Sequence, residues 1–420
     1  MVMTPDDDGI VSANGDVVAF KNWLAENGAE FHPHAAFRTE RSGYSVIASQ
    51  DLRSDTTVVS CPFSLAITPE VSKNALTTLL GPTFTGQSWS ERQLICSYIC
   101  MHWILDPSAS SELAHWPYIR MLPAPDKLRT PLHFSDTELE ALKGSNLYGA
   151  TLDRRRDWQS EWEQCQKTIA TVDLTWGEQF SWERYLSAST YLSSRAFPSM
   201  VLSPNPSLVS TEESYPVLLP GIDSLNHSRG QPVSWVVSIG TSSDVNRISL
   251  VLHKSTPAGS ELLNNYGPKP NAELILGYGF SLPENPDDTI VLKIGGNSAS
   301  GLQQQKWEVG RNAQGAGPMW RAILTAVSDD PEEQTIDDEL DASEVLAEMA
   351  QNLLDRLPIA NPPEDRIRPE VLLMLEHYLE GQRAILQSLI QFARDKESAA
   401  IKLAQEQGLQ TVEEDENEDM

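Results

Sequence analysis

Short apolar-rich runs of β type, bounded by polar turn residues, occur between residues 41 and 68. Two of them lie at 44–48 and 58–61. A third short run follows at 62–67. The pattern predicts a small antiparallel unit in this part of the chain.

Helical periodicity replaces this β-type pattern from Ser90 to about Ala196. Ser90 and Ser181 are favourable N-cap residues, each followed by apolar side chains at helical spacing. The proline-containing segment 116–123 predicts a loop between the first helix and the next. The second helix carries one stripe of apolar residues: Trp158, Trp162, Cys165 and Ile169. Such a stripe is typical of a face that packs into a core.

The β pattern returns at 233–239 and 248–253, two runs joined by a turn rich in Ser, Asp and Asn. A last strand is predicted at 289–294. The chain then becomes helical, with a long amphipathic helix after Pro369. Strands and helices that segregate in this way predict an α+β fold followed by an all-α region.

These patterns divide the chain into four predicted segments. They are a disordered leader at 1–16, an α+β domain at 17–290 that contains a helical block at about 88–200, a helical domain at 291–410, and an acidic tail at 411–420.

The 420 residues carry a formal net charge of -28, which is unevenly distributed. Segment 328–348 contains ten acidic residues and neither Lys nor Arg, and segment 411–420 contains six acidic residues and no basic one. Most such segments are simply solvated, but their field would also attract a basic protein partner. Direct binding of nucleic acid is disfavoured, because phosphate contacts need clustered Lys and Arg. The one basic run, 154–156, is predicted to lie on a helix surface.

Neither the apolar runs nor the cysteines point to a membrane or an oxidising compartment. No apolar run approaches the roughly 18 residues that a membrane span requires, and the acidic N-terminus lacks the apolar region of a secretory signal. The four cysteines, which lack CxxC spacing, are predicted to be reduced structural thiols: Cys61, Cys96, Cys100 and Cys165. We therefore expect a monomer in the cytoplasm or nucleus, with no membrane partner.

Two short polar clusters, 39 residues apart from His227 to Tyr266, are the strongest candidates for chemistry. An Asn-His pair such as Asn226-His227 is by itself most often structural. A metal site would need further ligands at compatible spacing, and none is found. The sequence also lacks the nucleophile elbow of serine hydrolases and the glycine-rich motifs that bind nucleotide phosphates.

Four segments, taken together in this order, resemble the SET-domain methyltransferases. They are 41–48 (Arg-Ser-Gly-Tyr-Ser-Val-Ile-Ala), 223–228 (Asp-Ser-Leu-Asn-His-Ser), 259–267 (Gly-Ser-Glu-Leu-Leu-Asn-Asn-Tyr-Gly) and 271–280 (Asn-Ala-Glu-Leu-Ile-Leu-Gly-Tyr-Gly-Phe). More narrowly, the chain is similar to the plant Rubisco large-subunit methyltransferase group. That group includes ribosomal-protein lysine methyltransferases and an actin-histidine methyltransferase.

The resemblance covers about residues 17–294 and implies a fold and a cofactor. The fold would be a SET-type pseudoknotted β fold, in which the segment of Asn226 and His227 threads past that of Tyr266. The helical block at about 88–200 would be the insertion that the group carries, and the C-terminal helices its substrate-binding domain. S-adenosylmethionine would bind on one side, and the target lysine would enter a narrow channel from the other.

The resemblance implies roles for the residues of this chain that match the family's functional residues. Tyr266 matches the catalytic tyrosine. The resemblance implies cofactor contacts at eight positions: Ser42, Gly43, Tyr44, Arg195, Asn226, His227, Tyr266 and Phe280. It implies a substrate channel lined by Arg195, Asp223 and Tyr278. Two departures are that Ser45 stands where the family often has a second glycine, and that the cysteine-rich zinc module of histone-type enzymes is missing.

The implied reaction needs residues of these types. Methyl transfer is an in-line displacement, so the enzyme mainly has to orient nitrogen, methyl group and sulfur. Lysine, with a pKa of about 10.4, must first lose a proton. A nearby sulfonium and an aromatic, desolvating channel both disfavour the ammonium form and so lower that pKa. A tyrosine hydroxyl and main-chain carbonyls can then orient the amine, and no metal is required.

We therefore predict an S-adenosylmethionine-dependent protein-lysine N-methyltransferase that acts on a non-histone, basic protein such as a ribosomal or translation component. Two alternatives stay open. One is a non-catalytic SET-derived scaffold that binds proteins, although the intact Asn226, His227 and Tyr266 argue against a decayed site. The other is a protein-histidine methyltransferase, because the choice of acceptor depends on the shape of the channel.

Overall fold

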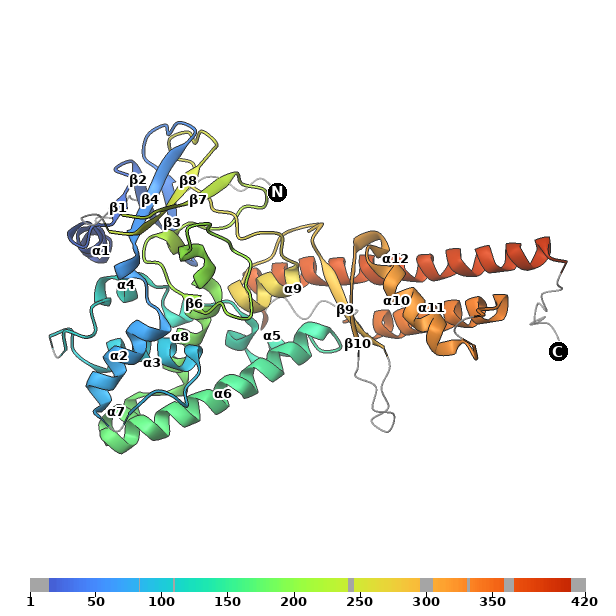
Figure 1. Cartoon of the computed structure of the whole chain (residues 1–420), viewed down its shortest axis with the longest axis horizontal. Coiled ribbons are helices and arrows are strands. Elements are labelled where there is room, and N and C mark those ends of the chain that lie inside the picture. The colour runs from blue at the N-terminus through green and yellow to red at the C-terminus, as the bar shows by residue number, and fades with distance from the viewer. Residues whose placement is uncertain are drawn as a thin grey trace. The chain divides into compact units, whose positions relative to one another are not determined.

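The computed structural model describes residues 15–82, 84–108, 110–240, 245–294, 305–330, 333–358 and 366–408. Contacts divide the chain into two compact units (Figure 1). Unit 1 comprises Met1–His133, Asp153–Pro268 and Gly277–Gly279, and unit 2 comprises Phe134–Leu152, Lys269–Leu276 and Phe280–Met420. Most of the predicted leader and the whole of the predicted acidic tail lie outside the described residues.

The largest sheet of unit 1 has four antiparallel strands in the order β1-β4-β8-β7 (Figure 1). Its strands are β1 (Glu30–Phe31), β4 (Thr56–Pro62), β7 (Val233–Ser238) and β8 (Arg247–Leu252). The predicted strands at 58–61, 233–239 and 248–253 are thereby confirmed to within two residues at each end. The central β4 is rich in β-branched residues and is buried from Val58 onward, as a strand covered on both faces must be.

The described residues of unit 1 contain two shorter strand pairs as well. They are β2 (Ala35–Glu40) with β3 (Gly43–Ala48), and β5 (Phe197–Pro198) with β6 (Pro216–Val217). The predicted antiparallel unit at 41–68 is partly wrong, because β3 and β4 do not pair with each other. The alternation of side chains sets which face a strand buries, but it does not select the partner strand.

The predicted third run at 62–67 is not a strand. Phe63–Leu65 forms a 3₁₀ turn, in which the Ala66 N–H donates to the Phe63 carbonyl over 3.1 Å. Pro62 is the last residue of β4, and Ile67 makes an isolated strand-like bridge to Leu218.

Three segments far apart in the sequence lie side by side beyond β3. The Leu262 N–H donates to the Val46 carbonyl over 2.8 Å, which pairs segment 259–262 with β3. Asn264 then pairs in parallel with His227: its N–H donates to the Asn226 carbonyl over 2.7 Å, and its carbonyl accepts from the Ser228 N–H over 2.8 Å. The two clusters that the sequence places 39 residues apart are thus neighbours in the backbone.

Helices make up most of the rest of unit 1. They are α1 (Gly15–Glu26), α2 (Pro69–Leu80), α3 (Glu91–Ile104), α4 (Trp116–Met121), α6 (Asn146–Val172, whose first residues are assigned to unit 2), α7 (Leu174–Gln179) and α8 (Trp182–Arg195). The predicted N-caps are confirmed: Ser90 forms a capping box with Gln93, and the Ser181 hydroxyl accepts from the Arg184 N–H. Cysteines 61, 96, 100 and 165 are buried free thiols.

The loop predicted at 116–123 is wrong, because Trp116–Met121 forms α4. Pro117 stands in the first turn of this helix, where a backbone N–H has no intrahelical acceptor to lose. Proline therefore starts a helix here and does not break one.

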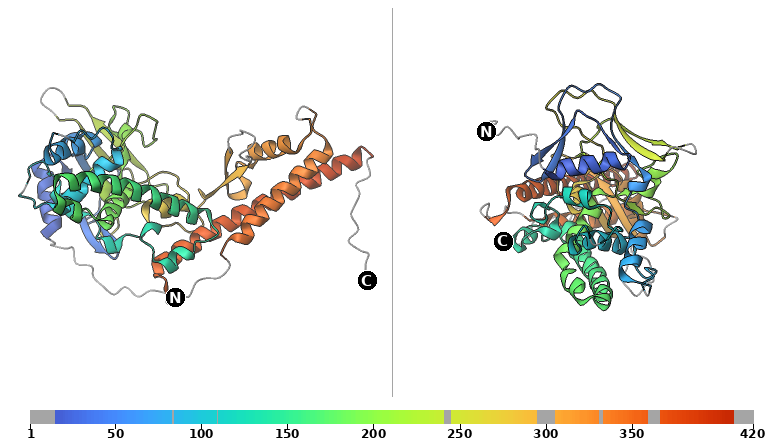
Figure 2. Two further views of the ribbon diagram at one scale, coloured as in Figure 1. Left: turned by 90° about the horizontal axis from the view of Figure 1, so that it is seen from below. Right: turned by 90° about the vertical axis from the view of Figure 1, so that its left-hand side faces the viewer.

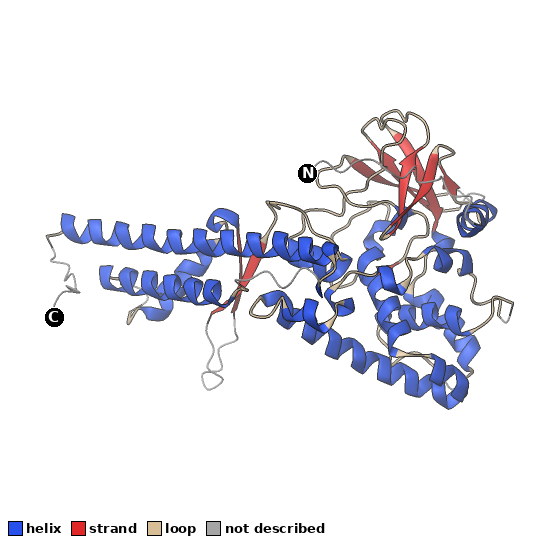
Figure 3. Ribbon diagram, turned by 180° about the vertical axis from the view of Figure 1, so that it is seen from behind, coloured by secondary structure: helices blue, strands red, loops and turns tan. Residues whose placement is uncertain are grey.

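The described part of unit 2 is helical, with one β-hairpin (Figure 3). Its hairpin consists of β9 (Thr289–Ile294) and β10 (Gln305–Gly310), and its helices are α5 (Asp136–Glu140), α9 (Asn271–Glu273), α10 (Ala316–Val327), α11 (Ile336–Arg356) and α12 (Pro369–Glu406). The strand predicted at 289–294 and the long helix predicted after Pro369 are confirmed. Helix α11 packs lengthwise along α12 (Figures 1 and 2). Strand β10 was not predicted.

The compact units differ from the predicted division at residue 290 in three segments. Phe134–Leu152, Lys269–Leu276 and residues 280–290, expected in the first domain, are assigned to unit 2. The physical reason is a shared core, since Leu142, Leu147 and Ile275 are buried in one cluster with side chains of α10, α11 and α12. None of the described helices has the length and apolar composition that a membrane crossing requires.

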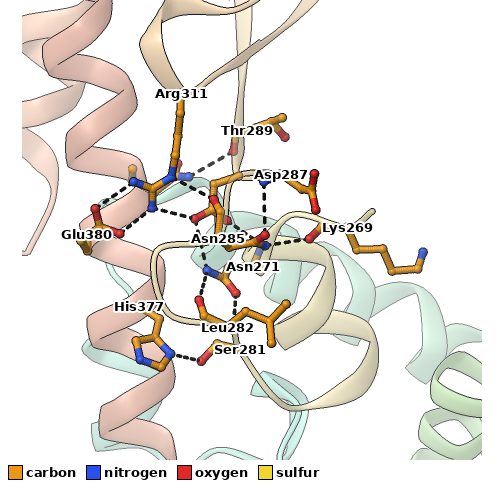
Figure 4. A network of polar contacts seen from close by, with 12 residues as sticks. Lys269, Asn271, Ser281, Leu282, Asn285, Asp287, Thr289, Arg311, His377 and Glu380 are labelled. Atoms are coloured by element: carbon orange, nitrogen blue, oxygen red, sulfur yellow. Dashed lines mark hydrogen bonds and ion pairs between the residues drawn. The ribbon is translucent and has the colours of Figure 1, made fainter. Parts of the chain in front are cut away.

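A buried ionic network holds the hairpin and α12 of unit 2 together (Figure 4). The Asp288 side chain, 2% exposed, accepts from the Asn271 N–H over 2.7 Å and from Arg311 Nη2 over 3.2 Å. Arg311 also donates to Glu380 on α12 over 2.9 Å. Gly381 is required beside this network, because any Cβ there would collide with the Asp288 carboxylate.

We predict that Asp288→Ala lowers the free energy of unfolding of the chain by about 3 kcal/mol, because it leaves the Asn271 N–H without its acceptor and removes the buried carboxylate that pairs with the Arg311 guanidinium. Glu380→Ala is the matched control, since it removes the other carboxylate of Arg311 but at a 46% exposed side chain. We expect it to cost less than about 1 kcal/mol. Chemical denaturation of both variants measures the difference, and equal losses would contradict the central role of Asp288.

Candidate active site

Tyr266 is held by contacts on both its backbone and its side chain. Its hydroxyl donates to the Leu225 carbonyl over 2.9 Å, and its backbone N–H donates to His227 Nδ1 over 3.0 Å. The ring stacks on His227 at a centroid distance of 5.0 Å and on Tyr278 at 5.3 Å. Because His227 Nδ1 accepts a hydrogen bond, a neutral His227 carries its proton on Nε2. The arrangement fixes the direction of the Tyr266 hydroxyl.

The electrostatic surroundings keep Tyr266 protonated. Burial raises the pKa of its phenol well above the usual value, and the neighbouring Arg195 offsets this only in part. Tyr278 and Asp223 raise the pKa further, because each would repel a phenolate when ionised. At neutral pH Tyr266 is therefore an oriented hydroxyl and not a base.

Arg195 and Asp223 form a second polar group next to Tyr266. Arg195 Nη1 donates to the Asp223 carbonyl over 2.9 Å and lies 3.4 Å from Asp223 Oδ2. The Tyr118 hydroxyl donates to the same Oδ2 over 2.6 Å. Among the described residues, the buried Asp223 Oδ1 has no hydrogen-bond partner. Burial raises the pKa of Asp223, against the lowering effect of Arg195 and Tyr118.

The local backbone explains why these two side chains meet. Arg195 is the last residue of α8, and Asp223 lies in a 3₁₀ turn at Ile222–Ser224. Gly221 precedes that turn with a φ of 88°, and a Cβ at this position would lie 3.2 Å from Val59. Glycine is therefore favoured where the chain turns against the central strand.

A pocket opens beside this polar pair. Tyr44, Tyr118, Arg195 and Asp223 line it together with Ser224 and four apolar side chains, namely Phe20, Phe37, Met121 and Leu122. It contains about 340 Å³ of empty space, part of it open solvent. Three residues predicted from different segments, Tyr44, Arg195 and Asp223, thus face one pocket that has both apolar walls and a charged pair.

Asparagine side chains shape the loop that carries Tyr266. Asn264 is 1% exposed, and its Oδ1 accepts from the Asn265 N–H over 2.7 Å. Asn265 Oδ1 accepts from the Gly267 N–H over 3.0 Å. The exposed Asn226 side chain donates to Glu261 over 2.8 Å. These short-range bonds give the loop an irregular path next to the parallel pairing of Asn264 with His227.

The remaining predicted residues lie in three other parts of the chain. Ser42 is in the exposed turn before β3, and Gly43 follows with a φ of 132°, where a Cβ would lie 3.2 Å from Pro123. Tyr278 ends a π-helical turn at Leu274–Tyr278, a geometry that is frequent at functional sites. Phe280 is assigned to unit 2, so its predicted place at the cofactor stays a prediction.

Three residues that hold the site are not among the predicted ones. Tyr118 lies in the segment predicted as a loop, 105 residues before the Asp223 that it contacts. Glu261 and Asn264 lie inside segment 259–267, whose resemblance to the SET-domain methyltransferases predicts a role only for Tyr266. Only the proximity of Asn264 to Tyr266 could have pointed to it.

Two buried histidines fix α4, which carries Tyr118. The Tyr98 hydroxyl of α3 lies 2.6 Å from Nδ1 of His115, the residue before α4, and His115 Nε2 lies 3.3 Å from the Leu65 carbonyl. Since a carbonyl only accepts, Nε2 carries the proton. His102 Nδ1 contacts the Tyr98 carbonyl over 2.8 Å. Burial lowers the pKa of His115 to about 4 and that of His102 to about 3.

Comparison with solved structures identifies the class of fold. The structure superposes on the SET domain of LSMT bound to lysine and AdoHcy with a TM-score of 0.75, at 17% identity and over 93% of both chains. It superposes on Rubisco LSMT bound to AdoMet with a TM-score of 0.70, at 17% identity and over 95% of this chain and 98% of the other. The predicted SET-type fold with a helical C-terminal region is confirmed.

Sequence comparison finds methyltransferases among the relatives. The chain is 32% identical over 275 residues to the ribosomal lysine N-methyltransferase set10 of Schizosaccharomyces pombe, and 24% identical over 299 residues to the actin-histidine N-methyltransferase of Mus musculus. The matches cover 64% and 68% of this chain but only 46% of each relative, so the chain spans about half of their length. No protein-family model matches the chain. The predicted resemblance to the SET-domain methyltransferases is confirmed in both sequence and fold.

We predict that acidification from pH 6.5 toward pH 4 destabilises the protein through His102 and His115. In the unfolded chain both take up protons near the usual histidine pKa of about 6.5, whereas the folded chain does not until its lowered values are reached. Their contribution to stability is therefore complete above about pH 6.5, and it is lost as the pH falls toward 4. Each histidine contributes up to about 1.4 kcal/mol per pH unit in this window.

Denaturation of His115→Gln across this pH range measures the effect. We expect a shallower dependence of the unfolding free energy on pH than in the wild type. His253→Gln is the control, because His253 lies on the surface with a 38% exposed side chain. An unchanged slope for His115→Gln would contradict the prediction.

Proposed function

We propose that the chain is a protein-lysine N-methyltransferase that uses S-adenosylmethionine and acts on a ribosomal protein or another component of translation. The observation that carries this proposal is the oriented, protonated hydroxyl of Tyr266 beside the Leu225 carbonyl. The similarity to a ribosomal lysine N-methyltransferase supports the choice of substrate.

The residues of the pocket fit S-adenosylmethionine, which is bound in the solved structure of Rubisco LSMT. Its amino-acid part carries an ammonium and a carboxylate, and the pocket offers both a guanidinium, at Arg195, and a buried acceptor without a partner, at Asp223 Oδ1. In this proposal Tyr44, Arg195, Asn226 and His227 hold the cofactor, with Ser42, Gly43 and Phe280 at its periphery. When bound, it supplies a methyl group on a sulfonium sulfur.

The chain's own residues orient and desolvate the incoming amine. The stacked rings of Tyr266, Tyr278 and His227 present a weakly polar wall, which disfavours the ammonium form of lysine and lowers its pKa. The Tyr266 hydroxyl donates to Leu225, so the lone pairs of its oxygen can accept a hydrogen bond from the amine. Holding the amine in one direction supplies the in-line geometry that methyl transfer needs.

Lysine is the acceptor that we propose, since the lysine-specific relative is 32% identical and the histidine-specific one 24%. Histidine is the second candidate, because the latter match covers a similar share of this chain. A scaffold without activity is less well supported, because Tyr266, His227 and Arg195 are intact and mutually positioned.

We propose further that the substrate is basic and that the enzyme is a monomer of the cytoplasm or nucleus. The described part of the acidic segment 328–348 supports the first point, since the exposed residues Asp337, Asp341 and Glu344 lie on α11. Their negative field would attract a basic protein most strongly at low salt.

Tyr266→Phe is predicted to lower kcat at least about 100-fold, as the loss of one positioned polar contact to a reacting group does in other enzymes. Binding of S-adenosylmethionine should stay within about threefold of wild type, because the ring stacking is retained. Transfer of radiolabelled methyl groups and calorimetry measure the two quantities. Tyr215→Phe, at a 38% exposed tyrosine, controls for loss of a hydroxyl. Undiminished turnover of Tyr266→Phe would exclude the proposed role.

The acceptor can be identified with purified components. We expect methyl-lysine in a ribosomal protein, and no methyl-histidine in actin, after incubation of each with the enzyme and S-adenosylmethionine. Mass spectrometry of the digested acceptors distinguishes the two products. If methyl-histidine were found in actin and no methyl-lysine in the ribosomal protein, the acceptor would be histidine, the second candidate.

A further inference from the structure

The carboxylate of Asp223 uses its two oxygens differently. Oδ2 accepts from the Tyr118 hydroxyl over 2.6 Å and lies 3.4 Å from Arg195 Nη1. Oδ1 is buried and has no hydrogen-bond partner among the described residues. The side chain of Asp223 is only 1% exposed, so bulk water does not reach it freely. Because buried polar atoms are nearly always paired, Oδ1 is a strong acceptor for a ligand that brings a donor.

The position of Tyr118 is fixed by its surroundings. Tyr118 is 2% exposed, and its ring lies 6.3 Å from the ring of Phe20 on α1. It belongs to α4, and His115, the residue before this helix, contacts the Tyr98 hydroxyl and the Leu65 carbonyl. The Tyr118 hydroxyl therefore holds the carboxylate that it contacts in one direction.

The Tyr118 hydroxyl also favours the charged form of that carboxylate. Burial raises the pKa of the Tyr118 phenol well above its usual value, so the group stays protonated and acts as a donor. Burial likewise raises the pKa of Asp223, while Arg195 and the hydrogen bond from Tyr118 lower it in part. A donor to a carboxylate stabilises the ionised form, since the protonated form is a weaker acceptor.

The other ionisable groups that interact with Asp223 are neutral. Burial raises the pKa of the Cys61 thiol on β4 to about 12, and Asp223 raises it further. Burial also raises the pKa of the Tyr266 phenol. The cation that faces the carboxylate is Arg195, which contacts the backbone carbonyl and Oδ2 of Asp223. Tyr118 and Arg195 therefore hold the same oxygen and leave the other one.

We propose that Tyr118 is a positioning residue of the cofactor site, whose hydroxyl holds Oδ2 of Asp223 so that Oδ1 accepts from the ammonium of S-adenosylmethionine. An ammonium has three donors and binds most strongly to a charged acceptor. Tyr118, Asp223 and Arg195 line one pocket. Tyr118 acts through Asp223 and takes no part in methyl transfer itself. This inference rests on the proposed function.

Tyr118→Phe removes the hydroxyl and keeps the ring that packs beside Phe20. Binding of S-adenosylmethionine weakens at the acidic pH at which Asp223 takes up a proton, and we expect this pH to rise by about one unit in the variant. We also expect Kd at neutral pH to rise about tenfold, because Oδ1 is no longer held in one direction. Calorimetry with the full chain between about pH 5 and about pH 8 measures both effects.

Tyr185→Phe is the matched control. Tyr185 is fully buried, and its hydroxyl also donates to a carboxylate, at Glu161 Oε2 over 3.0 Å. Both residues lie outside the lining of the pocket. We expect Kd for S-adenosylmethionine and its pH dependence to be unchanged in this variant. Equal shifts in Tyr185→Phe and Tyr118→Phe would contradict a specific role for Tyr118.

Asp223→Asn shows whether Tyr118 acts through Asp223. Since the amide does not ionise, adding Tyr118→Phe to Asp223→Asn should leave the pH dependence of cofactor binding unchanged. A further upward shift in the double variant would mean that Tyr118 acts on another group, and the inference would be excluded.

The stability of the free protein gives a measurement that does not need the cofactor. A carboxylate whose pKa is raised on folding destabilises the protein as the pH rises through that pKa, and Tyr118→Phe should raise the pKa of Asp223 further. The unfolding equilibrium constant of the variant, relative to wild type, is therefore expected to be about tenfold larger at neutral pH than near pH 4. An equal ratio at both pH values would be a packing effect alone and would exclude the inference.

The outcomes separate this inference from the proposed function. If the wild type binds S-adenosylmethionine and transfers methyl groups while Tyr118→Phe keeps the wild-type pH dependence, the role of Tyr118 is excluded and the methyltransferase remains. If the wild type neither binds S-adenosylmethionine nor transfers methyl groups, the proposed function fails, and the inference that rests on it fails too.

Discussion

The parallel pairing of Asn264 with His227 is the contact on which the rest of unit 1 depends. Two backbone hydrogen bonds join these segments, while the residues just before Asn264 pair with β3 on the other side. Any shift in this pairing would separate Tyr266 from the Leu225 carbonyl and from His227 at once. The site is therefore a consequence of how the chain closes on itself, since Tyr266 and its partners come from segments that are not consecutive.

Burial gives the polar groups of this site their properties. Asp223 and Tyr266 would behave as ordinary acids in water, but desolvation raises the pKa of both, and Arg195 offsets that effect only in part. The site thus combines one cation with hydroxyl groups that stay protonated, which is suited to orienting a reactant and unsuited to removing a proton directly. The buried Tyr118 extends the same network into α4, and the histidines behind that helix fix its position.

Much of the secondary structure could be predicted, because it depends on neighbours in the sequence. Ser90 and Ser181 cap their helices with their own side chains, and β9 follows a period-2 run within its own six residues. Helix α4 was missed, because proline is compatible with both a loop and the first turn of a helix. Strand β10 was missed as well, and it forms by pairing with β9.

The sequence by itself determined the order of the candidate site residues, the types of side chain and the resemblance that joins Asn226, His227 and Tyr266. These are properties of residues and their spacing. Only the tertiary structure decided that Tyr118 bonds to Asp223 and that Phe280 falls in unit 2. Contacts of this kind join residues tens to hundreds of positions apart, and local patterns do not encode which distant segment will be the partner.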